Sequence, residues 1–208
     1  MNDLEGSTRA TRSQLIRAGI RLFSSQGFRG TSVRELTRAA GANLGAITYH
    51  FGSKAALYEA VFAALAQPVR EVLEHAAGGD GTALDRIERC VRAHFAHLRQ
   101  HPELPRLMVR HLAGTRPLPQ AVRKAMAANI GLLAGLIARG QKEGSIRVGD
   151  PRFMALSVGG QPIFLALMAP ALREGAGIDA AAPGTHLELV ESAIGFIRAG
   201  LTAREEEA

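Results

Sequence analysis

The spacing of apolar residues along the chain predicts a protein built from helices. Between residues 9 and 25 the apolar positions recur one and three residues apart, so they share one helix face: Leu15, Ile16, Gly19, Leu22 and Phe23. A half-buried strand needs strict alternation of apolar and polar positions with β-branched residues, and no run of four or more positions shows it. The pattern therefore predicts an all-α fold.

Residues that start and stop helices divide the first part of the chain into short elements. Ser32 and Glu35 have the spacing of a capping box, in which each side chain satisfies a free backbone N–H of the first turn. Gly41 ends this second helix, and we expect Asn43 to cap a third helix that runs to about Phe51. A fourth helix should begin near Ser53, after a short turn.

Helical spacing continues after a glycine-rich linker, "AAGGDGT", at residues 76–82. The later segments with this spacing are 83–101, 103–113, 119–142, 151–172 and 185–203. We therefore expect about nine helices in two domains. An N-terminal three-helix helix-turn-helix domain should span 9–69, with its motif at 32–51, and a C-terminal antiparallel helical domain should span 76–208.

Positive charge is concentrated at the N-terminal end. Residues 1–54 hold 8 basic and 3 acidic side chains, a net +5, whereas residues 55–208 hold 17 and 16, a net +1. A basic N-terminal domain favours a polyanionic partner such as nucleic acid. The single cysteine, Cys90, excludes an intramolecular disulfide, and the first residues lack the apolar core of a secretory signal. We therefore expect a cytoplasmic protein.

The predicted third helix carries side chains suited to a DNA major groove, which is roughly 12 Å wide and accepts one helix. Ile47 would pack against the preceding helix and leave the opposite face free. Leu44, Gly45 and Ala46 are small or apolar, and so would allow a close approach to the bases. The other residues expected to contact DNA are Thr48, Tyr49, His50 and Lys54, with Thr31, Ser32 and Arg34 on the helix before.

One contiguous stretch combines these features. It contains "LF..QGF..TSVREL", the "AAG" turn, "YHF" at the end of the third helix and "SK..L" at the start of the fourth. In these motifs, residues 9–69 resemble the DNA-binding domain of TetR-type transcriptional repressors. The resemblance implies an all-helical homodimer that binds a double-stranded DNA operator, is released by a small-molecule effector and needs no cofactor. Many members carry Tyr where Thr48 stands, so we expect Tyr49 to make more of the contact.

The resemblance also makes the C-terminal domain the site of effector binding and dimerisation. For a mostly apolar effector, the expected pocket residues are His94, Leu98, Met108, His111, Met126, Ile130, Phe164 and Met168. The last helix has two apolar stripes, of which one can face the core and the other a copy of the same chain. The expected dimer residues are Phe153, Leu156, Leu189, Ala193 and Phe196.

Metal and catalytic sites are not expected. Cys90, His94, His97 and His101 share a helical spacing but span roughly 16 Å, so one ion with bonds near ~2 Å could use only two of them. The sequence has no GxSxG, P-loop or HExxH motif, which argues against an enzyme.

Two alternatives stay open. The chain could be a helical small-molecule-binding protein or enzyme whose helix-turn-helix is vestigial. Residues 153–172 also form a stretch of twenty residues without a formal charge, long enough to span a bilayer. Its glycines, prolines and Gln161 favour a helix buried among other helices, so we expect no membrane partner.

Overall fold

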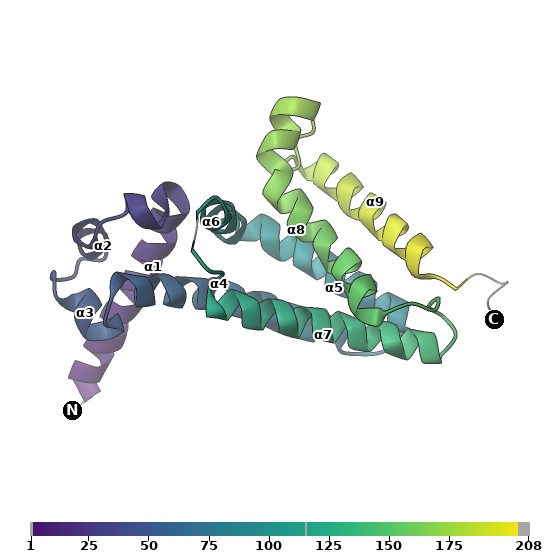
Figure 1. Cartoon of the computed structure of the whole chain (residues 1–208), viewed down its shortest axis with the longest axis horizontal. Coiled ribbons are helices and arrows are strands. Elements are labelled where there is room, and N and C mark those ends of the chain that lie inside the picture. The colour runs from purple at the N-terminus through teal and green to yellow at the C-terminus, as the bar shows by residue number, and fades with distance from the viewer. Residues whose placement is uncertain (1, 115, 204–208) are drawn as a thin grey trace. The chain divides into compact units, whose positions relative to one another are not determined.

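The computed structural model describes residues 2–114 and 116–203, and these residues form nine helices (Figure 1). In chain order the helices are α1 Asn2–Gly30, α2 Val33–Ala39, α3 Ala46–Phe51, α4 Lys54–Ala77, α5 Ala83–Gln100, α6 Glu103–Leu112, α7 Gln120–Lys142, α8 Pro151–Ala176 and α9 Pro183–Leu201. The all-α prediction is confirmed. The acidic end of the chain, residues 204–208, lies outside the described residues.

Side-chain caps fix where two of the helices begin. Ser32 Oγ accepts a hydrogen bond from Glu35 N at 3.2 Å, and Ser32 N donates to the Glu35 carboxylate at 2.7 Å, which is the predicted capping box. Thr82 and Asp85 form a second box at the start of α5, which we did not expect from the sequence. Gly27 interrupts α1 with a φ of 73° before the helix resumes.

The helices group into two compact units, and two helices cross the boundary between them. The first unit comprises residues 1–67 and 103–124, and the second comprises residues 68–102 and 125–208. The sequence places the domain boundary at residues 69–76, close to the first crossing, but α6 and the start of α7 group with the N-terminal helices. Both α4 and α7 therefore continue from one unit into the other.

In the first unit, α1 packs against α2, α3 and α6. Aromatic rings fill the core beside α4, where the Tyr58 ring meets Phe23 edge-on at 4.9 Å between centroids and Phe62 at 5.1 Å. Tyr58 Oη also lies 3.2 Å from His111 Nδ1, a buried contact that joins α4 to α6. Burial raises the pKa of Tyr58, so its hydroxyl stays protonated at neutral pH.

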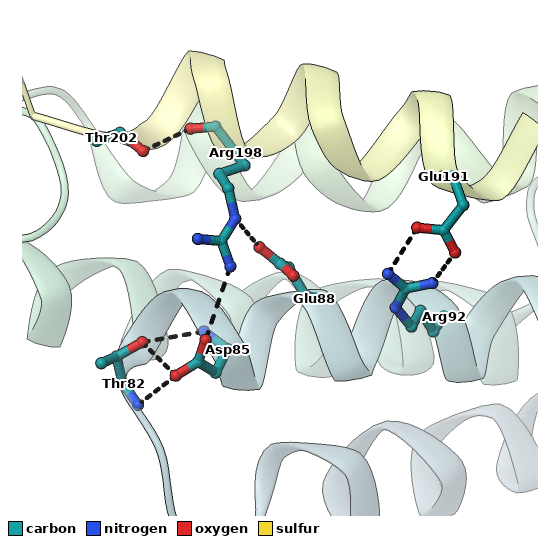
Figure 2. A network of polar contacts seen from close by, with 7 residues as sticks. All are labelled: Thr82, Asp85, Glu88, Arg92, Glu191, Arg198 and Thr202. Carbon is teal, nitrogen blue, oxygen red and sulfur yellow. Dashed lines mark hydrogen bonds and ion pairs between the residues drawn. The ribbon is translucent and has the colours of Figure 1, made fainter.

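The second unit is organised around α5, which packs against both α8 and α9. Ion pairs bridge α5 and α9 beside the buried contact (Figure 2). Arg92 forms a two-bond pair with Glu191, in which Nη2 and Oε2 are 2.9 Å apart, while Arg198 pairs with Glu88 and Asp85. The apolar side chains that α9 buries are Val190, Ala193, Ile194, Ile197 and Leu201.

The only cysteine lies inside this second unit. Cys90 is fully buried, and its Sγ donates to the Leu73 carbonyl oxygen at 3.5 Å. Burial raises the pKa of this thiol to about 11. His94 and His97 are also buried on α5, but no group of three or more His, Cys, Asp or Glu side chains in the described part of the chain could hold a metal ion.

Helix α8 leaves most of its apolar surface uncovered. It buries Met154, Ala155, Val158 and Pro162, but only 17% of its most apolar 18-residue window is buried. Within the single chain, residues 153–172 are therefore not buried among other helices. By length and composition alone α7 and α8 could each cross a membrane, which is a weak indication of such a role. The exposure of this apolar face of α8 therefore needs another explanation.

Buried histidines make the second unit sensitive to acid. Burial, with the neighbouring His97, lowers the pKa of His94 to about 4, whereas an unfolded histidine titrates near ~6.5. The unfolded chain therefore binds the extra proton first as the pH falls. The stability that neutral His94 contributes is complete above about pH 6.5 and is lost progressively toward pH 4, by about 3 kcal/mol.

We predict that His94→Gln flattens the loss of stability between pH 6.5 and 4, measured by urea unfolding at several pH values. The matched control is His75→Gln, because His75 is exposed at the end of α4. Equal pH profiles for the two variants would contradict the assignment of the acid response to His94.

Candidate nucleic-acid interface

Helices α2 and α3 form a compact corner on α1. The turn between them is closed by a hydrogen bond from Ala42 N to the Thr37 carbonyl at 2.9 Å, and Gly41 adopts a φ of 64°, which favours glycine. Leu36 of α2 and Ile47 of α3 are 0% and 1% exposed and share one core with α1. Because Ile47 points into this core, the opposite face of α3 lies toward solvent.

The third helix is shorter than the sequence predicts. It begins at Ala46, with Gly45 at the N-cap position and no side-chain cap, so the prediction that Asn43 caps it is wrong. Asn43 contributes through its backbone instead, since its carbonyl accepts a hydrogen bond from Ala46 N at 3.1 Å. Leu44 and Gly45 form the turn before the helix, and Leu44 is 57% exposed there.

The outer face of α3 and its turn present most of the predicted DNA-contact residues to solvent. Tyr49 is 77% exposed, and Gly45 and Thr48 are exposed beside it. His50 is half-buried, and its ring meets the Tyr49 ring edge-on at 4.9 Å between centroids. Ala46 is the exception: it is buried in the core, so its methyl group is not available to touch a thymine.

The structure separates the three residues predicted to bind phosphate at the start of α2. Thr31 is 0% exposed, and its hydroxyl donates to the carbonyls of Gly27 at 2.8 Å and Leu22 at 3.3 Å. Its side chain is therefore a structural contact rather than an available DNA contact. Ser32 and Arg34 are exposed, although the Ser32 hydroxyl is engaged in the capping box.

Lys54, the first residue of α4, is held by the protein itself. Its Nζ donates to the Thr31 carbonyl at 2.6 Å and lies 4.3 Å from the centroid of the Phe28 ring. Burial, followed by the nearby Arg116 guanidinium, lowers the pKa of Lys54. A phosphate contact would require this ammonium to leave the Thr31 carbonyl. Lys54 therefore joins α4 to the start of α2 in this structure.

Arg12 is an exposed basic residue beside α3 that the sequence pattern does not single out. Its guanidinium carbon lies 5.1 Å from the centroid of the Phe51 ring at the end of α3. Arg12 lies one turn before Leu15, which is fully buried. No local pattern reveals this neighbour, because the contact depends on how α1 packs against α3.

The eight residues predicted to line an effector pocket do not all belong to one unit. Met108 and His111 lie in the first unit, where His111 is buried and Met108 packs against the core. In the second unit His94 and Leu98 are buried, Ile130 is half-buried, and Met126, Phe164 and Met168 are exposed. Beside Ile130 in the sequence, Asn129 Oδ1 is a buried acceptor with no hydrogen-bond partner among the described residues.

Some of the predicted dimer residues are exposed and others are buried. Phe153 and Leu156 of α8 and Phe196 of α9 are 70%, 56% and 71% exposed, as an unpaired interface requires. Leu189 is half-buried, and Ala193 is 7% exposed because this side of α9 faces the core of its own unit. Leu187, on the same helix, is 60% exposed.

Comparison with known proteins shows which family and which proteins the chain resembles. The model of the family described as "Bacterial regulatory proteins, tetR family" matches residues 15–61, which include α2 and α3. The chain is 29% identical over 105 residues to the probable HTH-type transcriptional regulator YttP of Bacillus subtilis, an alignment that spans 50% of this chain and 51% of that protein. It is 28% identical over 156 residues to the HTH-type regulator RutR of Escherichia coli, across 72% of this chain and 70% of RutR.

A solved structure matches the fold over nearly the whole chain. The transcriptional regulator FadR of Bacillus subtilis, in complex with stearoyl-CoA, has a TM-score of 0.76 at 19% sequence identity. The match covers 90% of this chain and 98% of FadR. At this identity the likeness concerns the fold alone.

Proposed function

The chain belongs to the TetR family of bacterial regulatory proteins, and from this premise we propose that it is a homodimeric repressor released from its operator by a small, mostly apolar molecule. The family makes the chain a DNA-binding transcriptional regulator, in a family of regulators rather than enzymes. Repression, the near-palindromic operator, the effector class and the cytoplasmic location are the parts that we propose.

The exposed Tyr49 carries the proposal for the DNA interface. A tyrosine that is 77% exposed on a six-residue helix contributes little to the core, so its position favours contact with a partner. Leu44, Gly45 and Thr48 are exposed with it, while Ile47 holds the helix from behind. A dimer would place two such helices one DNA turn or somewhat more apart, about 34–36 Å or a little wider, on a near-palindromic site.

We predict that Tyr49→Ala lowers operator affinity roughly tenfold or more, because it removes a side chain that reaches the groove. The operator would first be selected from random DNA, and affinity measured by fluorescence anisotropy. Val148→Ala is the control, since Val148 is 81% exposed but lies outside the first unit. Unchanged thermal stability with unchanged affinity for Tyr49→Ala would show that another face binds DNA.

A second copy of the chain is the partner we propose for the exposed face of α8 and α9. Phe153, Leu156 and Phe164 on α8 and Leu187 and Phe196 on α9 leave large apolar side chains in water. Exposed apolar patches of this kind mark protein interfaces, and soluble homo-oligomers are most often two-fold dimers. The ion pairs to α5 occupy a different side of α9, so they leave Phe196 free.

We predict that Phe196→Asp converts the dimer to a monomer of about 22 kDa at micromolar concentration, because a carboxylate would be buried without a partner. Light scattering during gel filtration measures the mass. Leu112→Asp is the matched control, because Leu112 is 61% exposed in the first unit. A Phe196→Asp protein that keeps the mass of a dimer would place the interface elsewhere.

The second unit is where we propose that the effector binds. His94 and Leu98 on α5 offer a buried polar group beside apolar surface, and Asn129 Oδ1 on α7 is an acceptor with an unmet hydrogen bond in the described chain. A molecule with an apolar body and one hydroxyl or amide donor fits these groups. FadR, whose fold is similar, was solved with stearoyl-CoA, and the apolar acyl chain of that molecule supports an effector with an apolar body.

Helix α4 is the element through which we propose that the effector signal reaches the DNA-binding unit. It is continuous from Lys54 to Ala77, and the boundary between the units falls at Gln67–Pro68 inside it. Pro68 has no N–H, so the Ala64 carbonyl lacks its helical donor at this boundary. A helix bends more easily where such a bond is missing, which makes Pro68 a hinge.

We predict that Pro68→Ala restores this bond and makes the dimer less tolerant of operator spacing. Affinity would be measured on operators whose half-sites are moved one base pair closer or farther, and the penalty should grow about tenfold. Pro170→Ala is the control, because Pro170 also lies within a helix, α8, but away from the boundary. Equal spacing tolerance in the two variants and the parent would contradict a hinge at Pro68.

A further inference from the structure

The N-terminal turns of α1 extend beyond the core of the first unit. The helix begins at Asn2, and among its described side chains the first that is buried is Leu15, whereas residues 8–10 and 12–14 are exposed. Figure 1 shows this end of α1 running past α3 toward the N-terminus. The exposed residues of this projecting segment include Arg9 and Arg12.

Arg12 is held beside α3 by an aromatic contact. Its guanidinium carbon lies 5.1 Å from the Phe51 ring centroid, and a row of rings continues from there along α3. Phe51 meets His50 at 6.3 Å between centroids, and His50 meets Tyr49 at 4.9 Å. Phe51 follows the buried Ile47 by four residues and packs against the core, so Arg12 lies beside the last turn of α3, at the edge of the face that Tyr49 exposes. A cation–π contact uses the face of the guanidinium and leaves its in-plane N–H groups free to donate.

Arg9 lies on the same side of α1 as Arg12. Three residues correspond to about 4.5 Å along the axis and about 60° around it. Arg9 is exposed, so its guanidinium is accessible to an anionic partner.

We propose that Arg12 and Arg9 form a second contact with the DNA, to the phosphates that flank the base pairs read by α3. A helix that fills a groove roughly 12 Å wide has a phosphate backbone beside it, and a basic group fixed at the end of that helix lies where the backbone passes. The planar fork of arginine matches phosphate oxygens in geometry. This inference rests on the DNA interface proposed above and extends that interface beyond the helix-turn-helix.

A phosphate contact changes how DNA affinity depends on salt concentration, whereas a purely structural role does not. Each neutralised phosphate adds about 0.9 to the slope of log affinity against log salt concentration. We therefore expect Arg12→Gln and Arg9→Gln each to lower that slope by about 1 and to weaken binding by a similar factor on specific and on random DNA. Arg12→Lys should keep the slope, since it retains the charge.

The control variant is Arg17→Gln, on the same helix. Arg17 is exposed but lies about 140° around the axis from Arg12, so it should leave the slope unchanged. The length of the DNA gives a second readout. A fragment that extends about five base pairs beyond each half-site should bind the parent protein several-fold better than a trimmed fragment, and Arg12→Gln should remove that gain.

The possible results separate this inference from the function on which it rests. Unchanged salt slopes for Arg12→Gln and Arg9→Gln, with Tyr49→Ala still weakening binding, would overturn the flanking contact and leave the DNA interface intact. A loss of affinity in both Arg12→Gln and Arg12→Lys without a change of slope would mean that Arg12 only supports Phe51. Absence of any selected DNA sequence for the parent protein would overturn the proposed function itself.

Discussion

A six-residue helix has too few internal hydrogen bonds to be stable by itself, and α3 depends on what lies behind it. Ile47 and Ala46, buried in the core with α1 and Leu36 of α2, supply that support. The same contact sets the rotation of α3 about its own axis, because residues on one side of so short a helix leave the rest exposed. Tyr49 and Thr48 face solvent for this reason. The exposed face of α3 is thus a consequence of packing in the first unit, in which the contact of Tyr58 with His111 also joins α4 to α6.

Local signals along the chain were sufficient for the helices and for most of the residues that α3 and its preceding turn expose. The Ser32–Glu35 capping box follows from residues three positions apart, and it is present. Predictions that depended on tertiary contacts fared less well. Thr31 has the chemistry of a phosphate ligand, but its hydroxyl is used by carbonyls of α1, and Lys54 is bound to the Thr31 carbonyl. Arg12 was missed because its partner, Phe51, lies in another helix.

In the second unit, buried apolar side chains supply the stability, and the ion pairs between α5 and α9 set the orientation of α9. Exposed ion pairs contribute little on their own, but Arg92–Glu191 and the Arg198 cluster cross between α5 and α9 about two turns apart. Two such links favour one rotation of α9 about its own axis over other rotations. In that rotation Ala193 faces the core while Leu187 and Phe196 face outward. The sequence shows two apolar stripes on α9 but not which side chains face the core, because that choice depends on the partners on α5.

The buried thiol of Cys90 limits the kinds of signal that the protein can report. With a pKa of about 11, only about one thiol in ten thousand is ionised at neutral pH, and its Sγ is already bonded to the Leu73 carbonyl. Peroxides and electrophiles react with the thiolate form, so they would find almost none of it and no route to it. The chain has no second cysteine with which a disulfide could form. Oxidative stress is therefore not a signal that this regulator can receive through its cysteine.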